Sequence, residues 1–350
     1  MQRPHSAQLA QRLSEQVDDL AHCVGFSGVV SLHTANQAVF EQRYGHADIS
    51  NGIPNQVNTR FGMASGTKTL TAAAILRLID RGLFTLQTPA ADLLTASFPG
   101  LDPRITVRHL LTHTSGLADY FDESLVTGGE DYFLDVPWYR LRAPNDYLPL
   151  FMNRPAVAEP GETFAYNNGG YILLGAILEG ATGLTYHTVM QDEVFGPSGM
   201  SEAGFFPMNA LPERTAFGYV LHGDRWQTNV FNLPIVGASD GGAFCTVQDM
   251  QCFWTAVLRG ALLTPASRAS LLREEARDIN GQLGLHYGLG VYISAPDDQP
   301  RSYFAHGEDA GVFFHSQYWP ERDASLTLAS NTGKGAAKVM RLARTLLLAH

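Results

Sequence analysis

Ser65 and Lys68 have the residue types and the spacing of a nucleophile and its activating base. They lie three positions apart in ASGTKTLTAAAILRLIDRG (64–82), and residues three apart on a helix share a face. A serine hydroxyl needs a base or a cation beside it, and a helix N-terminus favours an oxyanion. A serine cap with a solvated lysine gives the same pattern, but the apolar run after Lys68 argues for a buried lysine.

Tyr166 and Asn168 form a second candidate pair, in ETFAYNNGGYILLG (162–175). Residues two apart on an extended segment point to one side, so both side chains could face one cavity. A tyrosine can transfer protons, and an asparagine can bind a lysine or a substrate amide. The alternative for this segment is an asparagine cap on the buried helix that follows.

His306 and Gly307 follow a strand-like run in SYFAHGEDAGVFF (302–314). A backbone N–H at such a strand could complete an oxyanion hole with the N–H of Ser65. The alternative is an ordinary hairpin turn with a surface histidine.

Three motifs occur in one order along the chain: Ser65-Gly-Thr-Lys68, Tyr166-Asn-Asn168 and His306-Gly-Glu308. With them, the chain resembles the serine β-lactamase and penicillin-binding-protein superfamily. It is most similar to the class C-like branch, which contains class C β-lactamases, DD-peptidases, D-aminopeptidases and family VIII esterases. The stretches ITVRHLLTHTSGL (105–117), PGETFAYNNGGYILLGAILEGATG (160–183) and GASDGGAFCTVQDM (237–250) add to the resemblance, which covers about residues 20–345.

This resemblance implies roles for the candidate residues. Ser65 would be the acylated nucleophile, with Lys68 and Tyr166 as proton-transfer groups. The residues implied to hold the substrate are Asn168, His306, Gly307 and Glu308. Which of Lys68 and Tyr166 is the general base is left open, because the two can share one proton.

The third motif departs from the pattern of the family, which is commonly Lys-Thr-Gly or His-x-Gly. Glu308 holds the last position, unless Gly307 takes that place, so the N–H groups of Glu308 and Asp309 are both candidates for the oxyanion hole. A carboxylate there would repel an anionic substrate, and penicillins, cephalosporins and DD-peptides all carry a carboxylate. We therefore expect a serine hydrolase of small neutral esters or amides and at best a weak β-lactamase. The alternatives are a β-lactamase, a DD-carboxypeptidase or D-aminopeptidase, and a catalytically inactive scaffold.

Hydrophobic periodicity predicts the elements that position these residues. A helix is expected over 6–22, then a hairpin with strands at 29–32 and 39–44, and several short strands after 285 before a closing helix. This pattern predicts an α/β (α+β) fold, an antiparallel sheet built from both termini and flanked by helices. The predicted domains are an α/β sandwich (1–64 and 285–350) and a mostly helical insert (65–284).

Composition limits the possible partners. The chain has 350 residues and a formal net charge of −10, without a cluster of Lys and Arg, so nucleic acid and anionic membranes are poor candidates. The most apolar run, 171–178, is too short to span a membrane. Three sparse cysteines and an N-terminus without a continuous apolar run lead us to expect a cytoplasmic location, or a periplasmic or secreted one if a leader has been removed. We expect a small acyl substrate, no cofactor and no metal, and leave the oligomeric state open.

Three further patterns in the sequence could belong to a functional site. The stretch GASDG (237–241) fits a nucleophile elbow with Ser239 as nucleophile, but the short segment before it contains Pro234. His109 and His113 have a zinc-like spacing without the glutamate of metalloproteases, so we expect buried, hydrogen-bonded histidines. The aromatic residues of loop 117–147 are expected to shape the substrate pocket; they are Tyr120, Phe121, Tyr132, Phe133, Trp138 and Tyr139.

Overall fold

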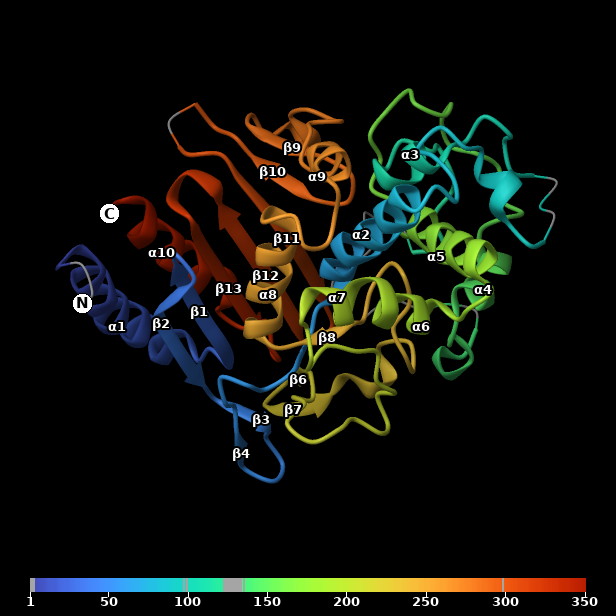
Figure 1. The fold of residues 1–350 in the computed structure, drawn as a ribbon. Coiled ribbons are helices and arrows are strands. Elements are labelled where there is room, and N and C mark those ends of the chain that lie inside the picture. Colours follow the sequence, from blue (N-terminus) through green and yellow to red (C-terminus); the bar gives the residue numbers. More distant parts are fainter. Residues whose placement is uncertain (1–3, 97, 99, 122–133, 135, 298) are drawn as a thin grey trace.

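The central element of the computed structural model is a seven-stranded antiparallel sheet with the order β2-β1-β13-β12-β11-β10-β9 (Figure 1). Its strands come from the two ends of the chain, as the sequence predicts. They are β1 (Gly28–Thr34), β2 (Gln37–Tyr44), β9 (Leu285–Tyr287), β10 (Tyr292–Ser294), β11 (Ser302–Asp309), β12 (Val312–Trp319) and β13 (Ala324–Ser330). The structure describes residues 4–96, 98, 100–121, 134, 136–297 and 299–350.

Helices precede, follow and interrupt the strands of this sheet. They are α1 (Pro4–Val24), α2 (Thr67–Asp80), α3 (Val107–Leu111), α4 (Pro144–Tyr147), α5 (Asn168–Thr182), α6 (Tyr186–Met190), α7 (Gly196–Ser198), α8 (Val247–Leu258), α9 (Pro265–Leu271) and α10 (Ala336–Leu348). Short strand pairs join β3 (His46–Asp48) to β4 (Ile53–Pro54), β5 (Phe61–Gly62) to β8 (Phe244–Cys245), and β6 (Tyr219–His222) to β7 (Arg225–Thr228).

The hairpin between β1 and β2 lies where the sequence predicts it. Ala35 and Asn36 form its two-residue turn, with φ angles of +50° and +61°. Two consecutive positive φ angles are typical of a type I′ turn, whose twist matches that of the flanking strands. The predicted first and last helices are also confirmed, as α1 and α10.

Helices cover both faces of the sheet. On one face, α1 and α10 share a hydrophobic cluster with Val30 and Leu328. The neighbouring residues Val29 and Ala329 belong to the cluster on the opposite face, which includes α2, α5 and α8. This division follows from the alternation of side chains along a strand.

The division of the chain into a sandwich (1–64 and 285–350) and a helical insert (65–284) stays a prediction. Figure 1 shows α3, α4 and α5 grouped beside the sheet. Helix α8 also falls between 65 and 284, but it packs on the sheet, where Trp254 Nε1 donates to Ser316 Oγ at 2.9 Å.

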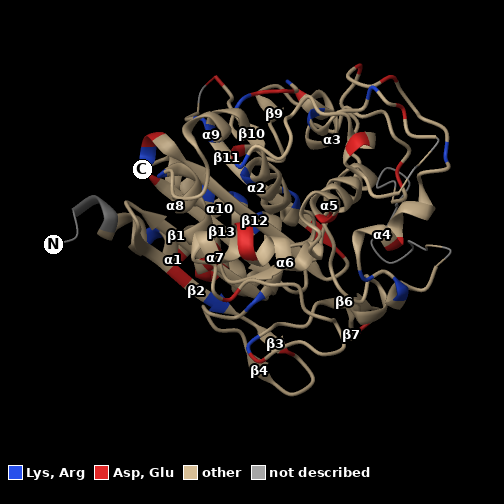
Figure 2. Ribbon diagram, turned by 45° about the vertical axis from the view of Figure 1, so that its right-hand side comes forward, with Lys and Arg blue, Asp and Glu red and all other residues tan. Residues whose placement is uncertain are grey.

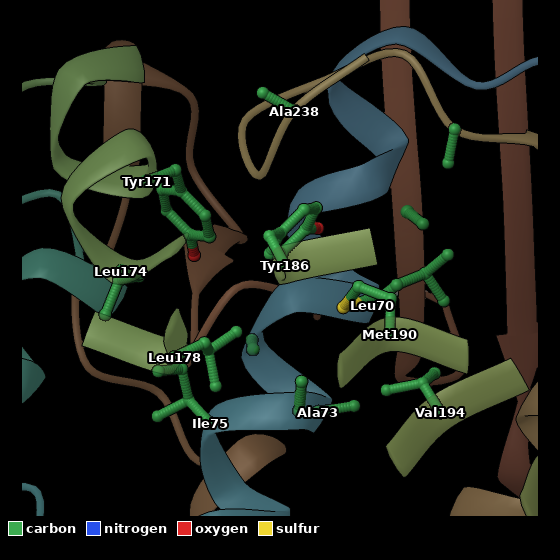
Figure 3. Close-up of a cluster of buried hydrophobic side chains, with 14 of the residues drawn as sticks. Leu70, Ala73, Ile75, Tyr171, Leu174, Leu178, Tyr186, Met190, Val194 and Ala238 are labelled. Carbon is green, nitrogen blue, oxygen red and sulfur yellow. The ribbon is translucent and has the colours of Figure 1, made fainter. Parts of the chain in front are cut away.

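Helix α2 is held against α5 and α6 by buried apolar side chains (Figure 3). Ile75 of α2 lies beside Leu178 of α5, and Leu70 of α2 lies beside Met190 of α6; all four are fully buried. Tyr186 of α6 joins the same cluster, and its hydroxyl lies 2.8 Å from Thr71 Oγ1. This packing fixes the start of α2 beside the start of α5, where Lys68 and Asn168 are found.

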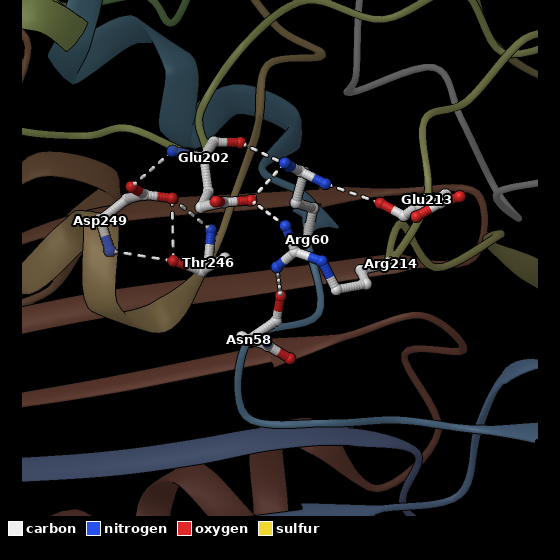
Figure 4. A network of polar contacts seen from close by, with 7 residues as sticks. All are labelled: Asn58, Arg60, Glu202, Glu213, Arg214, Thr246 and Asp249. Carbon is white, nitrogen blue, oxygen red and sulfur yellow. Dashed lines mark hydrogen bonds and ion pairs between the residues drawn. The ribbon is translucent and has the colours of Figure 1, made fainter.

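A polar network fixes the chain just before β5 (Figure 4). Arg60 donates through Nε to the carbonyl of Glu202 at 2.8 Å and through Nη1 to the carbonyl of Glu213 at 2.6 Å. Its Nη2 also pairs with the Glu202 carboxylate, which receives a second bond from Arg214 Nη2 at 2.7 Å. The Glu202 N–H donates to Asp249 at the start of α8. The network therefore ties the segment that leads to Ser65 to the body of the protein.

Charged residues are scattered over helices, strands and loops (Figure 2). Within the part of the chain that the structure describes, no helix is both long enough and apolar enough to cross a membrane.

Candidate active site

Ser65 and Lys68 lie together at the start of α2, as their spacing predicts. Ser65 is partly exposed in a 3-10 turn (Ala64–Gly66) that runs directly into the helix. The Lys68 side chain is only 2% exposed, and its Nζ donates to Ser65 Oγ at 2.9 Å. Ala64 has a φ of +44°, which non-glycine residues seldom adopt, and its carbonyl accepts from Thr67 Oγ1 at 2.8 Å.

Lys68 Nζ has two further acceptors besides Ser65 Oγ. It lies 2.7 Å from Asn168 Oδ1, at the first residue of α5, and 2.7 Å from the carbonyl oxygen of Asp240. An ammonium group has three N–H donors, and acceptors of this kind suit the charged form of Lys68. Lys68 can take the proton of Ser65 only after it has given one of its own away.

Tyr166 lies beside this lysine. Lys68 Nζ is 4.9 Å from the centroid of the Tyr166 ring and 5.7 Å from that of Tyr171, both within cation–π range. The two predicted proton-transfer groups, Lys68 and Tyr166, are therefore neighbours in space. Which of them is the general base stays open.

Strand β11 passes directly over the nucleophile at Gly307. A Cβ atom at Gly307 would lie 2.3 Å from the Met63 carbonyl and 2.6 Å from the Ser65 nitrogen. Only a glycine allows the strand to come this close. One edge of β11 pairs with β12 throughout. On the other edge, β10 pairs with β11 no further than Phe304, and beyond that point Glu308 and Asp309 of β11 border the pocket.

The side chains of His306 and Glu308 point away from Ser65, and their predicted role in holding the substrate stays a prediction. Gly307 pairs with Phe314, whose ring packs against the Ser65 turn at Gly66. Side chains alternate along β11, so His306 and Glu308 point to the opposite face of the sheet. There the His306 ring contacts Phe313. Glu308 still borders the pocket, at the edge of the strand.

His306 Nε2 lies 3.2 Å from Glu308 Oε1. The hydrogen bond from His306 lowers the pKa of Glu308. His306 Nδ1 lies 3.4 Å from His315 Nδ1. Burial, together with the charge of His306, lowers the pKa of His315 to about 3, so His315 is neutral.

A pocket of about 350 Å³ opens beside Ser65. Ser65, Asn168 and strand β11 border it, together with Tyr120, Phe121 and Trp138 from the predicted aromatic loop. Tyr139 of the same loop is 62% exposed, whereas Tyr132 and Phe133 lie outside the described residues. The charged residues in the described lining are all acidic: Asp240, Glu308 and Asp309.

Two aspartates near Lys68 make contacts in the site that the sequence did not predict. Asp240 supplies the carbonyl bonded to Lys68, and its carboxylate accepts from Tyr120 Oη at 2.5 Å. Asp119 accepts the N–H groups of Asn168 and Gly169 at 2.6 and 3.0 Å. Burial raises the pKa of Asp119 to about 6 against these hydrogen bonds. Asp240 lies in a stretch already noted for its resemblance, but only the fold brings its carbonyl to Lys68.

The structure does not support the alternative sites. Ser239 is fully buried, and a Cβ atom at Gly175 would lie 2.2 Å from its Oγ, so Ser239 has no access to a substrate. His109 takes part in the capping box of α3 with Thr106, and His113 uses both ring nitrogens in hydrogen bonds. The expectation of buried, hydrogen-bonded histidines is confirmed for His113, whereas His109 is hydrogen-bonded but only half-buried. Among the described residues, no cluster of three or more His, Cys, Asp or Glu side chains could hold a metal ion.

A family model described as Beta-lactamase matches residues 16–350. The match contains all three motifs that surround the pocket. The chain belongs to the β-lactamase family. The resemblance to the serine β-lactamase and penicillin-binding-protein superfamily is thereby confirmed.

Known relatives agree with this assignment. Penicillin-binding protein 4* of Bacillus subtilis is 28% identical over 84% of this chain, and esterase EstB of Burkholderia gladioli is 32% identical over 61% of it. The matches span 63% and 55% of these two proteins, which is less than two thirds of their lengths. Membership of this family, with an esterase among the relatives, supports the predicted class of serine hydrolase.

Solved structures show the same fold. A penicillin-binding protein from Bacillus halodurans superposes with a TM-score of 0.88 at 38% identity, over 94% of this chain and 99% of that one. A D-stereospecific amidohydrolase from Streptomyces has a TM-score of 0.80 at 22% identity, over 95% of this chain and 97% of that one. The second likeness concerns the fold alone. The predicted antiparallel sheet with flanking helices is confirmed by both.

Proposed function

We propose that this protein hydrolyses small neutral esters or amides through an acyl-enzyme on Ser65. The observation that carries the proposal is the buried Lys68, which donates to Ser65 Oγ beside the pocket. Attack by Ser65 Oγ on the substrate carbonyl forms the acyl-enzyme ester and expels the alcohol or amine of the substrate. Lys68 and Tyr166 would pass the proton from Ser65 to that leaving group. Water then attacks the acyl-enzyme, releases the acid and restores Ser65.

The preference for neutral substrates rests on the charges at the pocket. Its described lining residues include Asp240, Asp309 and, at the edge, Glu308, and neither lysine nor arginine. A substrate carboxylate would meet charges of its own sign there, which is unfavourable. The backbone N–H of Ser65 and one N–H of β11 near Gly307 would receive the oxyanion.

The experiment compares p-nitrophenyl acetate and butyrate with a chromogenic cephalosporin. Intact-mass spectrometry after a fluorophosphonate probe counts the adducts, and loss of the adduct in Ser65→Ala assigns it to Ser65. We expect one adduct on Ser65 and a higher kcat/KM for the esters. A higher kcat/KM for the cephalosporin would overturn the substrate preference. Absence of any adduct would favour an inactive scaffold.

A second candidate is hydrolysis of amino-acid amides, whose ammonium group suits the same carboxylates. D-Amino acid amidase from Ochrobactrum anthropi is among the proteins of this fold. Phenylalanine amide in its D and L forms tests this candidate. Faster turnover of the D amide than of p-nitrophenyl butyrate would favour amino-acid amides over simple esters as the substrate class.

A further inference from the structure

His113 has a backbone conformation that side chains seldom adopt. It follows α3 in the stretch LLTHTSGL (110–117), is 1% exposed and has a φ of +55°. Histidine is among the residue types tolerated in this region, but such conformations persist only where the surroundings enforce them, and they concentrate at functional sites. The catalytic steps proposed above do not use this residue.

His113 binds the chain on both sides of Tyr166. Its carbonyl accepts the N–H of Ala165 at 2.8 Å, and its Nδ1 accepts the N–H of Asn167 at 3.0 Å. Between these two bonds, the His113 ring packs against the Tyr166 ring, with 4.4 Å between centroids and 33° between planes. The residue therefore holds the position of Tyr166 by three separate contacts.

The hydrogen bonds also fix the protonation state of the ring. Because Nδ1 accepts a bond, the proton of neutral His113 is on Nε2, which donates to Tyr287 Oη at 3.1 Å. A proton on Nδ1 would oppose the Asn167 N–H. Burial, with the charge of Lys68, holds the pKa of His113 well below its usual value. His113 therefore acts as a fixed neutral acceptor.

Aromatic side chains pack closely around the His113 ring. It is packed by Tyr171 and Tyr287, each with centroids 5.0 Å away, and by Phe164 at 5.7 Å. Tyr171 Oη in turn donates to the Leu111 carbonyl at 2.9 Å. Through His113, the position of Tyr166 is therefore fixed by contacts with α3 and α5.

We infer that His113 is a positioning residue for catalysis: it holds Tyr166 beside Lys68 and does not itself touch the substrate. This inference rests on the proposed acylation of Ser65. Loss of the Nδ1 acceptor would leave the Asn167 N–H buried without its partner and would let Tyr166 move relative to Lys68. A displacement of about 1 Å is enough to cost roughly 10²-fold in rate.

Two variants separate the ring from its acceptor. His113→Phe keeps an aromatic ring against Tyr166 but removes the acceptor. His113→Asn keeps an oxygen near the position of Nδ1, and asparagine tolerates a positive φ. His109→Asn, at the other histidine of the same stretch, is the matched control. Tyr287→Phe removes the oxygen that receives Nε2–H and serves if His113→Phe does not fold.

The measurements are kcat and KM for p-nitrophenyl butyrate from pH 5 to 10, with thermal melts to verify folding. For His113→Phe we expect kcat about 10²-fold lower, KM within about threefold, and a displaced limb in the pH profile. His113→Asn should recover at least about tenfold of that loss, and Tyr287→Phe should lower kcat and displace the limb less strongly than His113→Phe. His109→Asn should behave as wild type.

A purely structural role predicts a different result, because it lowers the amount of folded enzyme and not its properties. Folded His113→Phe, or folded Tyr287→Phe in its place, with wild-type kcat and an unmoved pH limb would overturn the inference. Wild-type protein that the fluorophosphonate leaves unlabelled would instead overturn the proposed function, and the inference with it. Labelled wild type with unaltered variants overturns the inference alone.

Discussion

Replacement of Gly307 by alanine tests whether the close approach of β11 to the nucleophile sets the rate. The new methyl carbon would lie 2.3 Å from the Met63 carbonyl and 2.6 Å from the Ser65 nitrogen. Both neighbours are backbone atoms and cannot rotate away. An ordinary contact begins near 3.4 Å, so the strand and the Ser65 turn must separate by about 1 Å.

A separation of this size acts directly on the proposed oxyanion hole, because its two proposed N–H donors come from the two segments that move apart. We expect kcat/KM for p-nitrophenyl butyrate to fall about 10²-fold, which corresponds to about 2.7 kcal/mol of transition-state stabilisation. Overpacking should also lower the free energy of unfolding by about 1–3 kcal/mol.

The control is Gly82→Ala at the far end of the same helix, α2. Gly82 has a φ of +78° and no heavy atom within 4 Å of a Cβ at that position. This variant should lose about 1 kcal/mol of stability through backbone strain and keep wild-type kcat/KM. Gly307→Ala with wild-type kcat/KM, measured on folded protein, would refute the reasoning.

Three further predictions concern charge. Lys68→Met removes the donor to Ser65 and should lower the rate of fluorophosphonate labelling by about 10³-fold or more. The control, Lys338→Met, lies at an exposed position on α10 and should be labelled at the wild-type rate. Equal labelling rates for the two variants would contradict the proposed role of Lys68. Burial raises the pKa of Asp119 to about 6, from the ordinary value of 3.8 that applies to the unfolded chain. Between these two pH values Asp119 is protonated in the folded state and ionised in the unfolded state. Its contribution to stability is therefore lost as the pH rises from about 4 to about 6. Wild type should therefore lose Tm relative to Asp119→Asn across this range, and a constant Tm difference would count against the shift. Glu308→Lys reverses one charge at the pocket edge and should raise the cephalosporin-to-ester ratio of kcat/KM by about tenfold; an unchanged ratio would show that Glu308 does not select substrates by charge.

Local patterns predicted the strands of the central sheet and the first and last helices. Alternating apolar residues gave the strands of the sheet, and the turn at Ala35 and Asn36 was recognisable from its neighbours. Gly82 adopts the left-handed conformation just after α2, as is typical of the residue that follows a helix. These features depend on residues close together in the chain, where propensity and periodicity carry the information.

The sequence by itself identified Ser65, Lys68, Tyr166 and Asn168 as one set, because their types and order match known motifs, and the structure places them together. It did not determine the direction of the His306 side chain, since the face of a strand depends on its register with β12. Nor did it identify the Asp240 carbonyl as an acceptor for Lys68, or His113 as the residue that holds Tyr166. Those contacts join residues 172 and 54 positions apart, and only the packing of α2, α3 and α5 brings them within hydrogen-bond distance.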